Sequence, residues 1–247
     1  VSQTLEELEI IVVDDGSTDD SYRVVEEFFA RVSSESLILK ALHQDNLGVS
    51  AARNYGFSQA NGDYVMFFDS DDIMQSDCLE KMYERAKSTS ADIVMCGFDL
   101  VNEFGNVLGR YDDQYSYIEG VVAGKDASLM MLQNKIWLCT GSGLFMRSFI
   151  PEKGLRYQHG ATHGEDQEFD LKALFLSSKV TSVHESLVYY IQRESSAVRK
   201  KTMNQFHYVG SMRRLRRFLI LHGAVPDVLK VVDTAKSPQS YIDTLAL

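Results

Sequence analysis

Short apolar runs of strand character alternate with amphipathic helical stretches along the N-terminal part of the chain, and this alternation constrains the fold more than any other feature. The runs fall at 8–13, 36–42, 64–68 and 92–96. Between the first two runs, apolar side chains recur at the spacing of a helix face. Several runs are apolar throughout, which is typical of strands buried on both faces. The pattern predicts an α/β fold with a central, mostly parallel sheet that helices cover on both faces.

Composition narrows the classes of protein to which the chain can belong. Its 247 residues are 45% hydrophobic and carry a formal net charge of −10. The acidic balance argues against a nucleic-acid partner, because the basic surface that binds phosphates is missing. Cys78, Cys96 and Cys139 include no closely spaced pair and are expected to be reduced core thiols. With no charged-then-apolar leader and no run near the ~18 apolar residues that cross a bilayer, we expect a cytoplasmic protein, either free or peripheral on the inner face of the plasma membrane.

Two acidic turns follow apolar runs of the predicted sheet. Asp14 and Asp15 come at the end of the first run, and Asp69, Asp71 and Asp72 come at the end of the third. Ligands of open α/β sheets bind beyond the carboxyl ends of the strands, where the loops converge, so we expect the two turns to lie side by side. Crowded carboxylates raise each other's pKa, and a divalent cation or a basic ligand would stabilise them.

Asp69 and Asp71 are the candidate metal ligands. Residues two apart at the end of a strand can point the same way, and ligation by oxygen alone favours Mg²⁺ or Mn²⁺. A calcium loop that starts at Asp69 would have its twelfth ligand at Glu80, but Met74 stands where the sharp turn needs glycine. A solvated turn without a metal is the other interpretation.

Two further features carry candidate chemistry. Arg53 is the one cation near the two acidic turns in the predicted arrangement. Gly164, Glu165 and Asp166 open a predicted helix, where acidic side chains gain from the helix dipole. The functional interpretation of the same segment is that Asp166 is a general base, which takes a proton from an incoming hydroxyl.

Together, these motifs resemble the family 2 glycosyltransferases of bacterial capsule, lipopolysaccharide and exopolysaccharide pathways. The similarity covers roughly 5–195 and is carried, in order, by DDGSTD at 14–19, NLG at 46–48, ARNYG at 52–56, GDY at 62–64, FDSDD at 68–72 and GED at 164–166. The resemblance implies a Rossmann-like, nucleotide-sugar-binding glycosyltransferase A fold. It also implies an inverting transfer of one sugar, with UDP as the expected nucleotide, to an acceptor hydroxyl in cell-envelope polysaccharide synthesis.

The resemblance implies a role for each donor-side residue. Asp15 would contact the nucleotide base, and Arg53 would help to hold the nucleotide. Asp69 would face the ribose and the metal. Asp71 would bind the Mn²⁺ or Mg²⁺ that bridges the diphosphate, where a cation neutralises the charge of the leaving group.

On the acceptor side, the resemblance makes Asp166 the base, and Glu165 beside it would orient the acceptor or the base. Trp137 lies where family members have an acceptor-facing segment; it either stacks on a sugar ring or is a core residue. Arg193 follows a predicted strand and either reaches the diphosphate or is a surface arginine. The expected partners are therefore a nucleotide-sugar donor and a glycan or lipid-linked acceptor.

The predicted organisation is a glycosyltransferase domain at 1–198, with a donor half at about 1–98 and an acceptor half at about 99–198, and a helical extension at 199–247. Family members begin with an apolar strand and a nucleotide-contacting turn, and we expect this chain to lack that first β-α unit. The basic run at 213–217 either rests against anionic lipid headgroups or docks on the domain with its arginines in solvent. Beyond a polar stretch at 99–123, the pattern predicts helices at 125–133, 165–177 and 200–222, and strands at 143–147, 180–184 and 187–192.

Two other functions remain open from the sequence. A noncatalytic nucleotide-sugar-binding or assembly subunit would keep the fold without turnover, and it would have no need of a base at Asp166. A nucleotidyltransferase that makes the nucleotide sugar would need a glycine-rich phosphate loop after the first strand. No such loop is visible in the chain.

Overall fold

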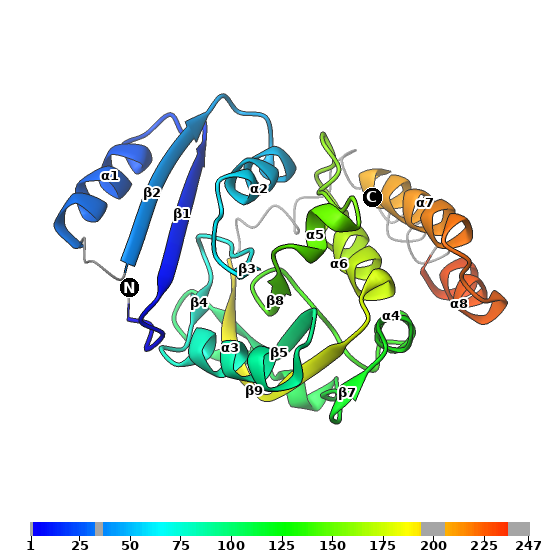
Figure 1. Cartoon of the computed structure of the whole chain (residues 1–247). Helices are drawn as coiled ribbons and strands as arrows, with labels where there is room; N and C mark the ends of the chain where they lie inside the picture. The colour runs from blue at the N-terminus through cyan, green and yellow to red at the C-terminus, as the bar shows by residue number, and fades with distance from the viewer. Residues whose placement is uncertain (1, 33–36, 194–205, 237–247) are drawn as a thin grey trace.

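The computed structural model describes residues 2–32, 37–193 and 206–236, and Figure 1 shows its arrangement. Helices cover a central sheet, and the predicted α/β class is confirmed. The strands are β1 Leu8–Asp15, β2 Leu37–Gln44, β3 Tyr64–Met66, β4 Ile73–Met74, β5 Ile93–Asn102, β6 Val107–Gly109, β7 Val121–Val122, β8 Gly143–Met146 and β9 Val180–Gln192. The α-helices are α1 Ser21–Val32, α2 Val49–Ser58, α3 Cys78–Thr89, α4 Gly124–Leu132, α5 Phe149–Glu152, α6 Glu165–Leu176, α7 Phe206–Leu221 and α8 Pro226–Val231.

The strands form two sheets in the described part of the chain. Strands β1 and β2 pair in parallel, with Leu8 opposite Leu37. The larger sheet has the order β3-β8-β5-β9-β4, with β6 on β5 and β7 on β9. Only the β5–β9 pair of this sheet is parallel. The prediction of a mostly parallel sheet is therefore wrong, because an apolar strand reports burial on both faces and not the direction of its neighbours.

Strand β9 is continuous, although the sequence predicted two short strands there. The register against β5 shifts between Met95, which faces Ser182, and Gly97, which faces Ser186. This irregularity places the polar middle of β9 at a bulge, where the inward-outward alternation of side chains is interrupted. Strand β3 forms one edge of the larger sheet and ends at Met66. Phe67 and Phe68 therefore belong to the loop that leads to the acidic turn.

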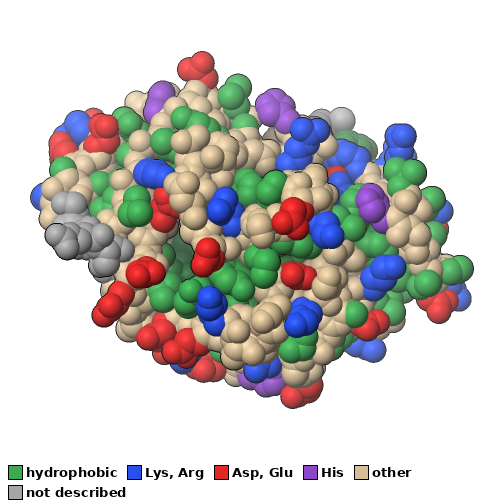
Figure 2. Space-filling view, viewed as in Figure 1, with side chains coloured by type: hydrophobic (Ala, Val, Ile, Leu, Met, Phe, Trp, Pro, Cys, Tyr) green, Lys and Arg blue, Asp and Glu red, His purple; other side chains and the backbone are tan. Residues whose placement is uncertain are grey.

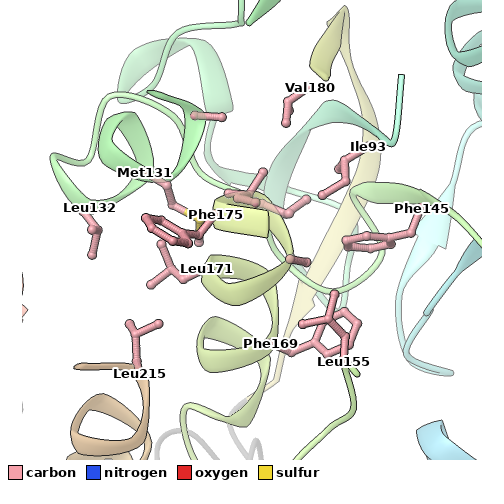
Figure 3. Close-up of a cluster of buried hydrophobic side chains, with 14 of the residues drawn as sticks. Ile93, Met131, Leu132, Phe145, Leu155, Phe169, Leu171, Phe175, Val180 and Leu215 are labelled. Atoms are coloured by element: carbon pink, nitrogen blue, oxygen red, sulfur yellow. The ribbon is translucent and has the colours of Figure 1, made fainter. Parts of the chain in front are cut away.

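The core has two parts, one on each side of the larger sheet. Helices α4, α6 and α7 cover the first part; Figure 3 shows Leu171 and Phe175 of α6 on the side of Met131 of α4, and Phe169 beside Leu155. Helix α3 covers the second part, in which Cys78 and Cys96 are buried. All three cysteines are unpaired, as predicted, and Cys139 is half-buried.

The C-terminal segment is helical where it is described. Helix α7 lies beside α6, and α8 follows it (Figure 1). The predicted boundary near residue 198 falls outside the described residues, so the domain division stays a prediction. Within the described ranges, no helix has both the length and the apolar character needed to cross a membrane.

Candidate functional site

Arg53 joins three segments that are far apart in the sequence. Its Nη2 lies 2.7 Å from Oδ1 of Asp69, and its Nη1 lies 3.5 Å from Oε1 of Glu165. The guanidinium carbon sits 5.0 Å from the centre of the Tyr157 ring, a cation–π contact. Only 12% of the Arg53 side chain is exposed. The predicted closeness of Arg53 to an acidic turn is confirmed for Asp69, and the structure adds Glu165.

Helix α2 holds Arg53 in place through contacts with the segment before α6. Asn54 Nδ2 donates to the Tyr157 carbonyl at 2.9 Å, and the Tyr157 N–H donates back to Asn54 Oδ1 at 3.0 Å. One turn earlier, Ser50 Oγ donates to the Ala161 carbonyl. Because these bonds fix both ends of the Tyr157 segment against α2, the ring stays under the Arg53 guanidinium. The motif contained Asn54, but neither its role nor Tyr157 was predicted.

Burial and neighbouring charges together set the pKa values of Arg53 and Glu165. Burial disfavours the charged guanidinium, but Tyr157, Asp69 and Glu165 together raise the pKa of Arg53 above its ordinary value. Burial also raises the pKa of Glu165 to about 7; the charge of Asp166 adds to this rise, and Arg53 opposes it. A carboxyl group that titrates near neutral pH beside a buried arginine is typical of a functional site.

The first turn of α6 carries the predicted base. Asp166 is half-buried, and its Oδ1 accepts a hydrogen bond from the Gln167 N–H at 2.7 Å. One turn further along the same helix face, Asp170 is buried, and burial together with the charge of Asp166 raises its pKa well above the ordinary value. Within the described residues, Asp170 Oδ2 has no hydrogen-bond partner. Asp170 was not predicted, although its spacing of four from Asp166 was visible in the sequence.

The acidic loop after β3 is fastened to β9 by Asp72. Asp72 Oδ1 accepts a hydrogen bond from the Ile191 N–H at 3.0 Å, and the Asp72 N–H donates to the Asp69 carbonyl. Burial raises the pKa of Asp72 to about 6; the charges of Asp71 and Asp69 add to it, whereas the Ile191 bond and Arg193 lower it. Asp72 therefore joins the acidic loop to β9. Arg193 lies close enough to act on this loop, and Asp71 is exposed.

The first acidic turn makes contacts of a different kind. Asp15 Oδ1 accepts hydrogen bonds from Gln44 Nε2 and the Leu47 N–H, and its Oδ2 accepts one from the Gly48 N–H at 2.9 Å. Gly48 precedes α2, so Asp15 holds the start of the helix that carries Arg53. No described interaction joins 14–17 directly to 69–72; the two turns are linked through α2. A contact of Asp15 with a nucleotide base stays a prediction.

The described residues contain no group of three or more His, Cys, Asp or Glu side chains arranged to hold a metal ion. Asp69 is engaged by Arg53, and Asp71 is exposed on the same loop. In nucleotide sites, Mg²⁺ is usually held by one or two carboxylates and by phosphate oxygens of the substrate. Two loop carboxylates fit that arrangement, with a diphosphate supplying the remaining ligands.

Trp137 is packed between the two parts of the core. Its ring stacks on Tyr115 at 5.9 Å between centroids and 28° between planes, and its backbone N–H donates to Tyr111 Oη. The core interpretation of Trp137 is therefore supported, because Tyr115 covers one face of the indole. Stacking of Trp137 on a sugar ring stays a prediction.

Arg214 and Arg216 of the basic run form ion pairs within the protein. Arg214 Nη2 lies 2.7 Å from Oε2 of Glu168 on α6, and Arg216 Nε lies 2.6 Å from Oδ1 of Asp233. Docking of the helix on the domain is therefore confirmed, but these two arginines are not simply solvated as predicted. On the face shown in Figure 2, basic side chains over the C-terminal helices lie among acidic and hydrophobic ones.

The chain is similar to known glycosyltransferases. The model of the family "Glycosyl transferase family 2" matches residues 1–152. The putative glycosyltransferase EpsH of Bacillus subtilis (strain 168) is 31% identical over 209 residues, covering 81% of this chain and 56% of EpsH. Glycosyltransferase GlyA of Streptococcus pneumoniae serotype 4 is 32% identical over 213 residues, covering 84% of this chain and 30% of GlyA. This chain thus spans about half of EpsH and less of GlyA.

Among solved structures, residues 1–349 of S. aureus TarS in complex with UDP-GlcNAc have a similar fold. The TM-score is 0.76 at 19% sequence identity, and the match covers 98% of this chain and 66% of that chain. At this level of identity the likeness concerns the fold alone.

Proposed function

Because the chain belongs to glycosyl transferase family 2, we propose that it transfers a sugar from a UDP-linked donor to an acceptor hydroxyl, with inversion at the anomeric carbon. The family resemblance seen in the sequence is confirmed, and the likeness to TarS confirms the glycosyltransferase A fold. The complex of TarS with UDP-GlcNAc supports a UDP sugar as the donor. The proposed setting is the synthesis of a cell-envelope polysaccharide, with a glycan or lipid-linked acceptor.

One observation carries the proposal: Arg53 contacts both the acidic loop and the first turn of α6. Asp69 lies on one side of the guanidinium, and Glu165 lies on the other. The resemblance gives the loop to the donor and the helix to the acceptor. A buried arginine between them places a fixed positive charge where a leaving diphosphate would gain from it.

On the donor side, the chain offers carboxylates from the loop after β3 and cations from α2 and from the end of β9. Asp69 and Asp71 would hold Mn²⁺ or Mg²⁺, which when bound neutralises charge on the leaving diphosphate. Arg53 lies beside Asp69, and the charge of Arg193 acts on the same loop through Asp72. These residues would bind and orient the diphosphate, and Asp15 would contact the base of the nucleotide.

On the acceptor side, Asp166 would take the proton of the acceptor hydroxyl. The acceptor oxygen then bonds to the anomeric carbon, the bond from that carbon to the diphosphate oxygen breaks, and UDP leaves with the electron pair. Such displacements pass through an oxocarbenium-like state, as glycoside hydrolysis does. Asp166 Oδ1 is held by the Gln167 N–H, which fixes the carboxylate for this task. Glu165 beside it would orient the acceptor or the base.

The test is turnover of a panel of UDP sugars with Mn²⁺, measured as release of UDP in the presence and absence of oligosaccharide acceptors. Asp166→Asn should retain donor binding and lose at least about 100-fold in transfer, the size typical of a lost general base. Asp71→Asn should weaken the dependence on Mn²⁺. Asp126→Asn is the matched control, since Asp126 is an exposed first-turn acid of α4 and should change nothing.

Four outcomes separate the alternatives. Binding of UDP sugars without any turnover would favour a noncatalytic subunit. Transfer that survives Asp166→Asn would contradict the base assignment, and an unchanged Mn²⁺ titration in Asp71→Asn would contradict the metal assignment. Absence of both binding and turnover would contradict the proposed function as a whole.

We further propose that the protein acts in the cytoplasm, with peripheral contact to the inner face of the plasma membrane where a lipid-linked acceptor would be presented. Arg213 and Arg217 are exposed on α7, and basic side chains are attracted to anionic headgroups. Sedimentation with vesicles of anionic lipid should therefore exceed sedimentation with neutral ones, and equal sedimentation would contradict the membrane contact.

A further inference from the structure

Helix α7 forms hydrogen bonds and an ion pair with the segment that carries the predicted base, Asp166. Tyr208 Oη donates to Gln167 Oε1 at 3.0 Å, and Ser211 Oγ donates to the His163 carbonyl at 3.2 Å. Arg214 Nε lies 3.1 and 2.9 Å from the two carboxylate oxygens of Glu168. The contacts thus reach His163, which lies just before α6, and Gln167 and Glu168, which follow Asp166.

The backbone at the start of α6 is shaped to let α7 approach. Gly164 precedes the helix with a φ of +71°, in the left-handed region that favours glycine. A Cβ atom at Gly164 would overlap the ring of Tyr208. Glycine at this position therefore serves two needs, the turn and the close contact with α7.

The ion pair at Glu168 anchors the first turn of α6. The Glu168 carboxylate is buried, with Lys172 Nζ at 2.6 Å and Arg214 Nη2 at 2.7 Å. A buried carboxylate is stable only when its charge is compensated and its oxygens are hydrogen-bonded. Because Glu168 N–H also donates to the Gly164 carbonyl, the anchor fixes the turn between them.

A short path leads from α7 to the reacting carboxylate. Tyr208 holds the side chain of Gln167, and the backbone N–H of Gln167 holds Asp166 Oδ1 at 2.7 Å. Any rotation of this turn would move Asp166 and would also pull Glu165 away from Arg53. Misplacing a reacting group by about 1 Å costs on the order of 100-fold in rate.

We propose that Tyr208 and Arg214 are positioning residues, which hold the first turn of α6 so that Asp166 faces the acceptor hydroxyl. This inference rests on the proposed function, and it assigns the C-terminal helix a part in the reaction. Neither residue touches the donor or the acceptor; both act through Gln167, Glu168 and the turn that contains Asp166.

General stability is the competing explanation, and α7 allows the two to be separated. Met212, Leu215 and Leu219 are buried in the core, so removing the helix would expose the core and destabilise the domain. Tyr208→Phe removes only a hydroxyl and leaves the ring against Gly164. Arg214→Gln removes the charge and keeps much of the side-chain length. Arg216→Gln is the matched control, because Arg216 lies on the same helix and pairs with Asp233 of the C-terminal segment, not with α6.

The experiment measures kcat, the donor KM and the affinity for UDP in the full chain, with UDP-glucose, UDP-galactose and UDP-N-acetylglucosamine as donors. We expect kcat to fall about tenfold in Arg214→Gln and about threefold in Tyr208→Phe, because small misplacements of a base already cost this much. The donor KM and the UDP affinity should stay within about twofold, since no described hydrogen bond or ion pair joins α7 to the acidic loop after β3. Arg214→Lys should recover part of the kcat, and Arg216→Gln should match the parent chain.

Amide hydrogen exchange at Glu168 gives a readout that does not depend on activity. Its N–H should exchange faster in Arg214→Gln than in Arg216→Gln. Equal kcat in Arg214→Gln, Tyr208→Phe and Arg216→Gln would overturn the positioning role while leaving the proposed function intact. A parent chain that turns over none of the donors would contradict the proposed function itself, and the positioning role would fall with it.

Discussion

Two acidic regions of the molecule stabilise their charges in opposite ways. At the end of β1, hydrogen bonds from Ser17 lower the pKa of Asp14; partial burial opposes this shift, and His43 adds to it. In the corner around Arg53, burial raises the pKa of Asp72 to about 6 and that of Glu165 to about 7. Carboxyl groups thus find enough hydrogen-bond donors at the end of β1 and too few donors around Arg53.

This difference indicates which region is built for a ligand. The first turn supplies its own hydrogen bonds and mainly positions the start of α2. The corner gathers carboxylates from the β3–β4 loop and from α6 around Arg53, and their charged forms are only partly compensated. A cation or a hydroxyl-bearing ligand would relieve this imbalance, which is how perturbed pKa values mark functional sites.

The largest expected difference between the two regions comes from replacing Arg53. Arg53→Gln leaves the carboxylates of Asp69 and Glu165 without their shared partner in a mostly buried place, so we expect the free energy of unfolding to fall by about 3 kcal/mol. Transfer should be lost as well. Urea unfolding and UDP release measure the two effects.

Arg23→Gln is the control, on helix α1, which follows the first acidic turn. Arg23 also lies between two carboxylates, those of Asp20 and Glu27, but its side chain is 59% exposed. Its loss should leave the urea midpoint unchanged, because exposed ion pairs contribute little. If Arg23→Gln and Arg53→Gln destabilised the protein equally, burial would not be what distinguishes the two regions.

The next effect is the pH dependence of stability through Glu165. The pKa of Glu165 is about 7 in the folded protein and ordinarily 4.5, so between these values the folded state keeps a proton that the unfolded state has lost. The unfolded state therefore binds fewer protons, and stability falls as the pH rises through this window. We expect a loss of about 2 kcal/mol between pH 5 and pH 8 from this group.

Urea unfolding at several pH values checks this expectation, and Glu165→Gln should flatten the pH dependence between pH 5 and 8. Glu84→Gln, which changes an exposed glutamate of α3, should leave it as it is. An identical slope in the parent chain and in Glu165→Gln would show that Glu165 is not protonated in the folded state near neutral pH.

The sequence predicted the parts of this comparison that local pattern can encode. Apolar runs located β1, β2, β3 and β5, and helical spacing located α6, because burial leaves a periodic trace. The motifs named Arg53, Asp69 and Glu165, and the structure joins all three. The positions of these residues beside predicted strand ends and at the start of a predicted helix singled them out, and the family resemblance added the role expected of each.

What the sequence did not predict depends on contacts across long stretches of chain. Tyr157 lies in an irregular segment and meets Asn54 across 103 positions, so no periodicity points to it. The directions of the strands in the larger sheet were wrong for a similar reason, because register and direction come from partners distant in the sequence. Asp170 was visible only as a spacing, and its burial follows from the packing of α6 between the sheet and α7.

The smallest expected effect is on the free energy of unfolding, which should change in opposite directions when Asp170 and Asp14 are each replaced by asparagine. Asp170 is buried, its Oδ2 has no partner within the described residues, and its pKa is raised. Asp170→Asn removes the charge and supplies donors, so at pH 8 it should raise the free energy of unfolding by about 1 kcal/mol. Asp14→Asn should lower it, because Asp14 accepts hydrogen bonds from Ser17 and lies 2.7 Å from His43 Nδ1. Urea unfolding at pH 8 measures both effects. A loss of stability in both variants would mean that the Asp170 carboxylate has hydrogen-bond partners as good as those of Asp14. A lack of partners for buried charge would then no longer distinguish the corner around Arg53 from the first turn.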